Sequence, residues 1–362
     1  ARIVAPGDDD FTGRHADFAT LRKEGGISGY PSQAESDHDI VENSHASTAL
    51  SYADGLSKAF ELNGQRNRHV VAVVGDGALT GGMCWEALNN ISDDNDRNLI
   101  IIVNDNGRSY APTIGGMARY LNRVRTGPSY RAMYRSSGQV FGKFGAAGRA
   151  MYRGLRGGTH GFLSRLTNNA ALYSNLDIKY LGPVDGHDLE AMIETLQMAK
   201  SYGAPVIVHT ITEKGRGYQP ALDDHDDQFH AVGKINPDTG ASMSKSSVPG
   251  WTDVFAEELV RIGEQRADVI AITAAMLRPT GLAPFAERFP DRTYDVGIAE
   301  QHAVTSAAGM AYGGLHPVVA IYATFMNRAY DQVLMDVALH KAGVTFVLDR
   351  AGVTGPDGPS HH

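Results

Sequence analysis

The chain has 362 residues, 42% of them apolar, which is long enough for two domains of ordinary size that each bury a core. The formal net charge of −8 and the sequence pI near 5.9 argue against general binding to nucleic acids or to anionic membranes. No apolar run approaches the roughly 20 residues needed to cross a bilayer, and the single cysteine cannot form an intramolecular disulfide, so we expect a cytoplasmic protein without a membrane span.

The first predicted helix follows a polar, irregular stretch over residues 1–40. Ser44 is a suitable N-cap for this helix. Apolar residues then recur at helical spacing from Ala46 to Phe60, and Gly64 ends the run.

Two short apolar runs then stop at polar residues in the same way. They are VAVVGDG (71–77) and IIIVNDN (100–106), with a helix predicted over residues 83–91 between them. If both runs are buried parallel strands, Asp76 and Asn106 can approach one cation from neighbouring strand ends. Mg²⁺ prefers such oxygen ligands and is often shared with phosphates, and small glycines let the backbone approach a phosphate closely. The pattern therefore predicts a magnesium and diphosphate site, although GDG alone is more often an ordinary turn.

The span between residues 107 and 176 has a different composition. It contains no Asp or Glu and eleven basic residues, and it is rich in glycine and small side chains. We interpret it as a mobile, solvated, arginine-rich insertion. An electropositive flap that attracts anionic substrates is the alternative, and a nucleic-acid role would have to overcome the acidic remainder of the chain.

Beyond the insertion, short strands alternate with amphipathic helices, which predicts an α/β fold with doubly wound parallel sheets. Residues 236–250 have the composition of a linker, so we expect domains over residues 1–240 and 241–362. The predicted strands are 176–182, 204–212, 268–275, 293–297, 316–324 and 344–352, and the predicted helices are 189–203, 251–263, 299–314 and one that runs through Leu339.

Glu300 stands where a predicted strand passes into a helix, in the segment DVGIAEQHA. Alone, it is best explained as a first-turn acid that favours the helix dipole. Together with GDG and NDN it resembles the thiamine diphosphate enzymes, in which one domain holds the diphosphate through a metal and another holds the aminopyrimidine. The resemblance implies that Glu300 hydrogen-bonds a pyrimidine nitrogen from a largely dry pocket, where its proton affinity is raised. The cofactor would act as the electron sink of the reaction.

A longer set of motifs narrows this resemblance to the transketolase-like family of 1-deoxy-D-xylulose-5-phosphate synthases. It implies decarboxylation of pyruvate and condensation with glyceraldehyde 3-phosphate for isoprenoid and thiamine precursors. Thiamine diphosphate and Mg²⁺ would be the cofactors, and a homodimer is expected. The motifs are, in chain order, ENSHASTALSYADGLSKA, VVGDGALTGGMCWEALNN, YLGPVDGHD, EKGRGY, DVGIAEQHA, YATFMNRAYDQ and LDRAGVTGPDGPSHH.

The resemblance also implies roles for individual residues. Without it, each has an ordinary structural explanation, such as a surface ion pair for an Arg, a satisfied structural His or a core Phe. The metal ligands would be Asp76, Asn106 and the backbone carbonyl of Arg108. The cofactor contacts would be Ser44, His45, Ala46, Gly77, Ala78, Asn106, Tyr218, Glu300 and Phe325. The acceptor would meet Tyr322, Arg328, Arg350, Asp357 and His361, and Glu300, His45 and His361 would take part in catalysis.

The chain departs from the family pattern in three ways. A GHQAY-like strand end before the matched region and a third α/β domain after it are not found, and Gly107-Arg108 replaces a glutamate–methionine pair. We therefore expect a chain truncated at both ends, with the second domain incomplete. Two alternatives stay open: a transketolase-type ketol transfer, or an inactive fragment that serves as a binding or dimerisation module.

Overall fold

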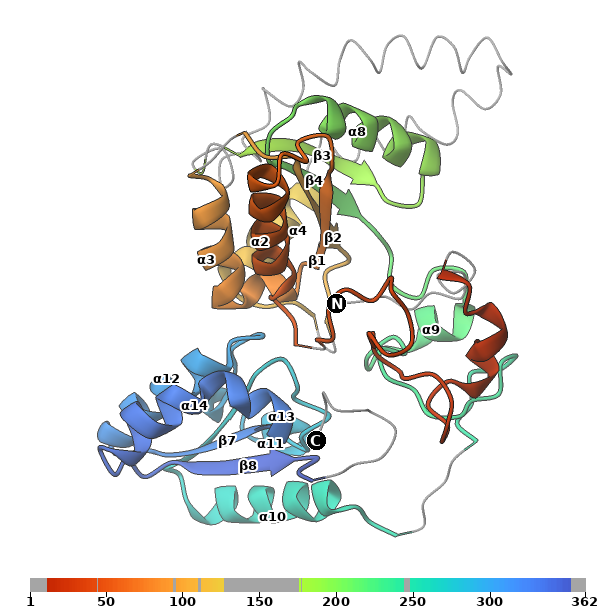
Figure 1. Ribbon diagram of the computed structural model, residues 1–362. Coiled ribbons are helices and arrows are strands. Elements are labelled where there is room, and N and C mark those ends of the chain that lie inside the picture. Colours follow the sequence, from red (N-terminus) through yellow and green to blue (C-terminus); the bar gives the residue numbers. More distant parts are fainter. Residues whose placement is uncertain are drawn as a thin grey trace. The chain divides into compact units, whose positions relative to one another are not determined.

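The computed structural model describes residues 12–43, 45–93, 96–109, 112–126, 176, 178–243 and 248–352. The chain divides into two compact units, Ser47–Val232 and a second unit made of Ala1–Ala46 with Gly233–His362. Each unit contains one four-stranded sheet (Figure 1). The domain boundary predicted after residue 240 stays a prediction.

The unit Ser47–Val232 is built on a parallel sheet with the order β1-β2-β4-β3. In register, Val70 lies beside Leu99 and Ile100 beside Val206. The strands are β1 (Val70–Gly75), β2 (Leu99–Asp105), β3 (Lys179–Asp185) and β4 (Val206–Ile211), and the helices are α2 (Ala49–Leu62), η2 (Ala78–Thr80), α3 (Gly82–Ile91), α4 (Gly115–Thr126), α8 (Leu189–Ser201) and α9 (Gln219–Asp223).

Helices cover both faces of this sheet because its strands are apolar on both sides. On one face, Leu50 of α2 and Leu88 of α3 pack with Ile101 in one buried cluster. On the other face, Ala199 of α8 packs with Val208. All four strands run parallel, so their carboxyl ends meet at one edge, where α/β sheets place ligand sites.

Helix α2 begins later than the sequence predicted. Its first residue is Ala49 and its N-cap is Thr48, not Ser44, which lies outside the described residues. Ser47 has a positive φ of 70°, a left-handed conformation that cannot belong to an α-helix, and its hydroxyl donates to the Ala78 carbonyl at 2.7 Å. The chain therefore makes a turn at the positions where the first helical turn was expected.

The second unit has a parallel sheet with the order β6-β5-β7-β8. Leu259 and Phe285 cover one face, and Ala303 and Ala307 cover the other. The strands are β5 (Val269–Thr273), β6 (Thr293–Asp295), β7 (His316–Tyr322) and β8 (Thr345–Asp349), and the helices are η1 (His15–Thr20), α10 (Trp251–Gln265), α11 (Ala283–Arg288), η5 (Pro290–Arg292), α12 (Glu300–Tyr312), α13 (Ala323–Met326), η6 (Asn327–Ala329), α14 (Tyr330–Gln332) and η7 (Val333–Ala338).

Two details of this unit differ from expectation. The single helix predicted through Leu339 is wrong, because α13, η6, α14 and η7 follow one another as short pieces with different hydrogen-bond patterns. Helix α11 was not predicted. Otherwise, the α/β class with two doubly wound parallel sheets is confirmed.

Two other expectations concern membrane-spanning helices and the arginine-rich insertion. Within the described ranges, every helix is too short or too polar to pass through a bilayer. The arginine-rich insertion lies mostly outside the described residues, so its predicted mobility stays a prediction.

Candidate active site

Asp76 and Asn106 directly follow two neighbouring strands, β1 and β2. The Asp76 amide donates to the Asn104 carbonyl at 3.1 Å, so the two strand ends remain paired to their last residues. The Asp76 side chain is 1% exposed, and the Thr113 hydroxyl donates to its Oδ2 at 2.5 Å. Asn106 is half-buried, and its Oδ1 accepts from the Arg108 amide at 3.1 Å. A carboxylate and an amide oxygen thus lie at adjoining strand ends, where the sequence predicted them.

A cavity of about 420 Å³ opens at the same edge of the sheet. Its wall is formed by residues at or directly after the ends of β2, β3 and β4, and it includes three cationic side chains and the carboxylates of Asp185 and Glu213. Glu213 pairs with Arg216 at 3.7 Å, so the wall is weakly positive, which favours an anionic ligand. The lining residues are Asn106, Arg108, Asp185, His187, Ile211, Thr212, Glu213, Lys214, Arg216 and Gln228.

Lys214 is the most perturbed cation of this wall. Its ammonium group donates to the Ser109 carbonyl at 2.7 Å and to Nδ1 of His230 at 2.9 Å. Burial lowers the pKa of Lys214 to about 8, against the opposing charge of Asp227. Lys214 and His230 were not predicted as site residues, although Lys214 belongs to the EKGRGY motif.

The remaining predicted contacts of this unit lie in short turns. Leu79 donates its amide to the Asp76 carbonyl at 3.2 Å, so Gly77 and Ala78 sit in a tight turn directly after Asp76. Tyr218 is the N-cap residue of α9, and its ring lies 6.0 Å from that of Phe229. Arg108 reaches the Asp226 carbonyl with Nη2 at 2.8 Å.

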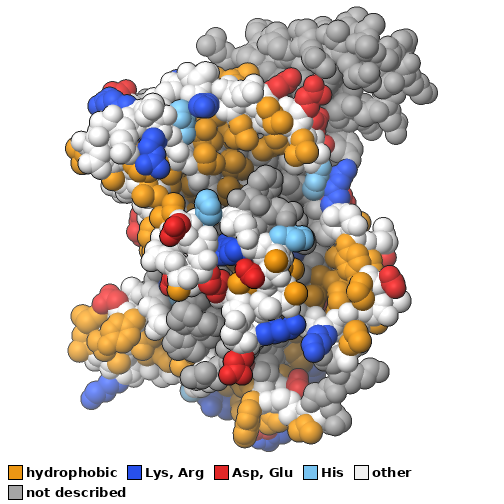
Figure 2. Space-filling view, turned by 45° about the vertical axis from the view of Figure 1, so that its right-hand side comes forward, with side chains coloured by type: hydrophobic (Ala, Val, Ile, Leu, Met, Phe, Trp, Pro, Cys, Tyr) orange, Lys and Arg blue, Asp and Glu red, His pale blue; other side chains and the backbone are white. Residues whose placement is uncertain are grey.

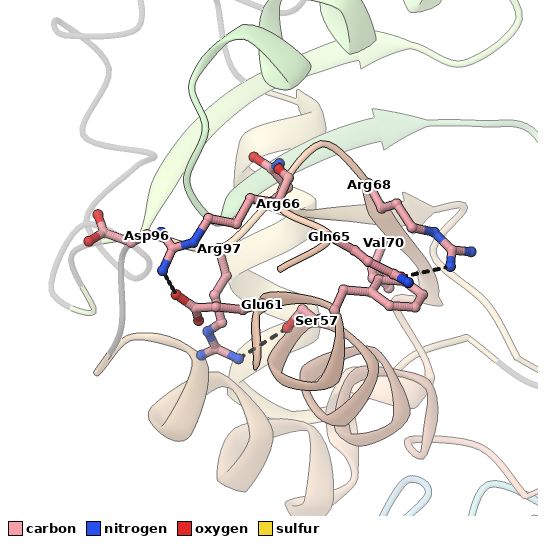
Figure 3. Close-up of a pocket in the computed structure, with 10 residues that line it drawn as sticks. Ser57, Glu61, Gln65, Arg66, Arg68, Val70, Asp96 and Arg97 are labelled. Carbon is pink, nitrogen blue, oxygen red and sulfur yellow. Dashed lines mark hydrogen bonds and ion pairs between the residues drawn. The ribbon is translucent and has the colours of Figure 1, made fainter. Parts of the chain in front are cut away.

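A smaller hollow lies at the opposite end of the strands (Figure 3). Its volume of about 20 Å³ has room for little more than a water molecule. Arg66 is paired with Glu61, and Arg97 donates to the Ser57 hydroxyl at 3.1 Å. The size of this hollow excludes a cofactor, so the candidate site is the wide cavity at the carboxyl edge.

In the second unit, Glu300 is the first residue of α12 and is 3% exposed. Its buried Oε2 has no hydrogen-bond partner among the described residues. Burial raises the pKa of the Glu300 carboxyl, although the charge of Arg328 works in the opposite direction. The Glu300 carboxyl therefore has one buried oxygen available for a hydrogen bond to a ligand, and it has an increased affinity for a proton.

A group of predicted residues from distant parts of the sequence meets in this second unit. His45 lies edge-on to Phe325 with ring centroids 5.2 Å apart, and Phe325 stacks on Tyr322 at 5.8 Å. Arg350 places its guanidinium 4.5 Å from the centre of the Tyr322 ring. Arg328 donates to the Ala46 carbonyl and, at 3.4 Å, to Nδ1 of His45. Ser44, Asp357 and His361 lie outside the described residues.

Both units contain groups that fit the implied cofactor. The orphaned Oε2 of Glu300 can accept or share a proton with a ring nitrogen in a dry pocket. Among the described residues, no three His, Cys, Asp or Glu side chains form a metal-binding group. A metal at Asp76 would consequently draw its other ligands from amide, backbone and phosphate oxygens, as Mg²⁺ does.

The chain is similar to known proteins over nearly its whole length. A solved transketolase from Leishmania mexicana aligns with 96% of this chain and 58% of its own at 16% identity, but its TM-score of 0.38 adds nothing to the topology. A 1-deoxy-D-xylulose-5-phosphate synthase of Leifsonia xyli subsp. xyli is 73% identical over 97% of this chain and 54% of its own length. The corresponding protein of Tropheryma whipplei (strain Twist) is 64% identical over 97% of this chain and 56% of its own.

This chain thus spans about half the length of the curated relatives it matches. The model of a transketolase pyrimidine-binding domain matches residues 247–362. The family model described as 1-deoxy-D-xylulose-5-phosphate synthase matches residues 10–212, which is more than half of the chain. The chain therefore belongs to the 1-deoxy-D-xylulose-5-phosphate synthase family.

Proposed function

We propose that the chain is the cofactor-binding part of a 1-deoxy-D-xylulose-5-phosphate synthase, which decarboxylates pyruvate and joins the two-carbon unit to glyceraldehyde 3-phosphate. The proposal rests on one observation above others: Asp76 and Asn106 lie at paired strand ends beside a cavity with a cationic wall. Such an edge offers oxygen ligands to Mg²⁺ and positive charge to a diphosphate. The product would serve as a precursor of isoprenoids and thiamine.

We assign the diphosphate end of thiamine diphosphate to the unit Ser47–Val232. Asp76, Asn106 and the carbonyl of Arg108 would hold Mg²⁺, and the turn at Gly77 and Ala78 would contact the phosphates. Lys214 adds a positive charge to the cavity wall at pH values below about 8. Tyr218 is a further proposed cofactor contact of this unit, and Ser44, His45 and Ala46 are proposed contacts from the second unit.

Glu300 is the proposed proton-handling group for the aminopyrimidine. Because burial raises its pKa, it holds a proton more readily than an exposed glutamate and can share it with a ring nitrogen. Phe325 would pack against the same ring. The bound cofactor would supply the electron sink for the decarboxylation.

The acceptor glyceraldehyde 3-phosphate would be held by cationic and aromatic groups of the second unit. Arg328 and Arg350 can make charge-assisted hydrogen bonds to its phosphate. In the structure, Arg328 already donates through Nε and Nη2 to His45 and Ala46, so it would have to share these donors. Tyr322, Asp357 and His361 complete this proposed group, with His45 and His361 as further catalytic residues.

Replacing Asp76 with Ala tests the magnesium assignment. Isothermal titration with thiamine diphosphate should show saturable binding that requires Mg²⁺ in the wild-type chain and is lost in Asp76→Ala. Asp93→Ala, at an exposed position of the same unit, is the matched control and should bind normally. Normal affinity in Asp76→Ala would overturn the assignment.

The reaction itself is tested by incubating the chain with pyruvate, glyceraldehyde 3-phosphate, thiamine diphosphate and Mg²⁺. Release of CO₂ together with a five-carbon product separates this activity from a transketolase-type ketol transfer, which releases none. The match to the synthase family model over residues 10–212 favours the first outcome. Cofactor binding without turnover would instead favour the alternative of a catalytically inactive binding module.

We further propose that the protein is a homodimer that works in the cytoplasm. Large apolar side chains are exposed along one stretch of the second unit, where Tyr312 bonds the Asp336 carbonyl at 3.2 Å. Figure 2 shows hydrophobic side chains exposed at several places on the face it presents. Sedimentation of the purified chain would test the stoichiometry. The exposed residues are Tyr312 (60%), Tyr330 (69%), Leu334 (47%), Met335 (48%) and Leu339 (65%).

A further inference from the structure

A chain of hydrogen bonds, buried at its inner end, crosses three strands of the sheet in the unit Ser47–Val232. Asp105, the last residue of β2, is 0% exposed, and its Oδ2 lies 3.0 Å from Nε2 of His209 on β4. The other ring nitrogen of His209, Nδ1, lies 2.6 Å from the hydroxyl of Tyr180 on β3. None of these three residues was assigned a role by the sequence motifs.

The direction of the bonds follows from the groups involved. We assign Asp105 as ionised and the His209 ring as neutral, so that Nε2 of His209 donates to the carboxylate, which can only accept. In the neutral ring, Nδ1 is then the acceptor for the Tyr180 hydroxyl. His209 is 1% exposed and its bond to Asp105 is buried, whereas its bond to Tyr180 is partly buried. The backbone of β3 packs tightly against His209: a Cβ added at Gly182 would lie only 2.6 Å from the His209 carbonyl oxygen.

The NDN motif consequently contains three polar residues with different partners. The Asn104 side chain accepts from the Thr212 hydroxyl at 2.7 Å, and the Asp105 carboxylate accepts from His209. The Asp105 carbonyl also accepts from the Thr212 amide at 3.0 Å. Asn106 alone lines the cavity. The first two residues therefore tie the end of β2 to β4, and the third is presented to the ligand.

Burying a carboxylate is costly unless it is paired and hydrogen-bonded, and an apolar pair is often at least as stable. Stability alone is thus a weak explanation for Asp105 and His209. The pair lies directly before the candidate metal ligand, and groups that orient metal ligands commonly change metal affinity by 10–100-fold when altered.

We propose that His209 is a positioning residue for the magnesium site: by holding the Asp105 carboxylate it fixes the end of β2 and hence the direction of Asn106. This inference rests on the proposed function, because it takes Asn106 to be a metal ligand. His209 itself touches neither metal nor cofactor. Tyr180 contributes only the hydrogen bond to Nδ1 of the His209 ring.

Two substitutions of His209 separate this role from general stability. The amide nitrogen of Gln can take the place of Nε2, so His209→Gln keeps a donor for Asp105. The amide of His209→Asn reaches only to the position of Nδ1 and removes the hydrogen bond that His209 donates to Asp105. We expect His209→Asn to raise the Mg²⁺ concentration for half-maximal thiamine diphosphate binding by at least tenfold, and His209→Gln and Tyr180→Phe to change it less than threefold.

Ile207→Val is the control for a plain loss of core packing, since Ile207 lies fully buried two residues away on the same strand. If His209→Asn and His209→Gln shift the Mg²⁺ requirement equally, or no more than Ile207→Val does, the proposal is overturned. Should the His209 variants fail to fold, Asp105→Asn serves instead. Asn has the same shape as Asp, but its neutral amide oxygen makes a weaker hydrogen bond with His209. An unchanged Mg²⁺ requirement in Asp105→Asn would contradict the proposal.

Amide hydrogen exchange tests the positioning without any ligand. The Thr212 and Arg108 amides are bonded to Asp105 and to the Asn106 side chain, so both report on the end of β2. They should exchange about tenfold faster in His209→Asn than in His209→Gln, while the Val70 amide at the far end of the sheet stays unchanged. Equal exchange in both variants would refute the positioning role. A wild-type chain that binds no cofactor would refute only the proposed function.

Discussion

Replacing Glu300 with Gln is expected to remove part of a pH dependence of the protein's stability. Burial raises the pKa of this carboxyl above its ordinary value of 4.5, so the folded state binds the proton more tightly than the unfolded state does. Stability from this group is fully present below pH 4.5 and is lost as the pH rises through the higher pKa of the folded state. Gln has no proton to lose, and the corresponding loss should be missing in Glu300→Gln.

The size of the effect has an upper limit. One proton of difference between the folded and unfolded states changes the free energy of unfolding by at most about 1.4 kcal/mol for each pH unit. Asp295 has a pKa raised by burial in the same unit, and its contribution has the same sign and remains in the variant. The difference between wild type and Glu300→Gln therefore isolates one titrating group.

Urea unfolding followed by circular dichroism between pH 4.5 and 7.5 measures this difference. The wild-type free energy of unfolding should fall more steeply with pH than that of Glu300→Gln above pH 4.5, until the pH passes the raised pKa of the folded state. Glu257→Gln, at an exposed position of α10, should follow the wild-type curve. Parallel curves for wild type and Glu300→Gln would show that Glu300 is not the desolvated acid described above.

Three further predictions concern the unit Ser47–Val232. With a pKa of about 8, roughly half of Lys214 is uncharged at pH 8, against well under 1% for an ordinary lysine, so an amine-directed reagent should modify it well before the exposed Lys200 in a peptide map; equal rates would contradict the lowered pKa. Arg97→Met should lower the free energy of unfolding by about 1 kcal/mol in urea titrations, because Asp54 loses its buried partner 2.5 Å away but keeps Lys58 at 2.7 Å; an unchanged free energy of unfolding would show that the pair matters little. Chelation of Mg²⁺ with EDTA should release bound thiamine diphosphate during gel filtration, and a cofactor that remains bound would argue against metal-mediated binding.

The sequence predicted the strand ends of the first sheet because that signal is local. Each apolar run stops at a polar residue, and the structure ends β1 at Gly75 and β2 at Asp105, directly before Asp76 and Asn106. Glu300 was placed at a strand-to-helix passage for the same reason, and it is the first residue of α12. Local patterns of burial therefore located both candidate groups without any knowledge of packing.

Contacts between distant residues could not be predicted in this way. His209 pairs with Asp105 across more than a hundred positions, and no periodicity indicates that partner. The start of α2 was wrong because a positive φ at Ser47 is not encoded by residue type. A strand was predicted over residues 176–182. The strand instead covers Lys179–Asp185, since an edge strand tolerates a proline at an irregularity in its register.

The charges at the carboxyl edge of the first sheet explain why metal and anion would need each other there. Asp76 is a buried carboxylate, and a lone carboxylate does not balance a divalent cation. The cavity wall carries Arg108, Lys214 and Arg216 against Asp185 and Glu213, so its net charge is weakly positive and disfavours a bare cation. A diphosphate would remove both obstacles to metal binding. Its oxygens would neutralise the positive charge of the cavity wall and would supply the metal with further ligands. On the proposed assignment, Mg²⁺ and diphosphate would therefore bind as one unit, because each would neutralise groups that the other leaves unbalanced.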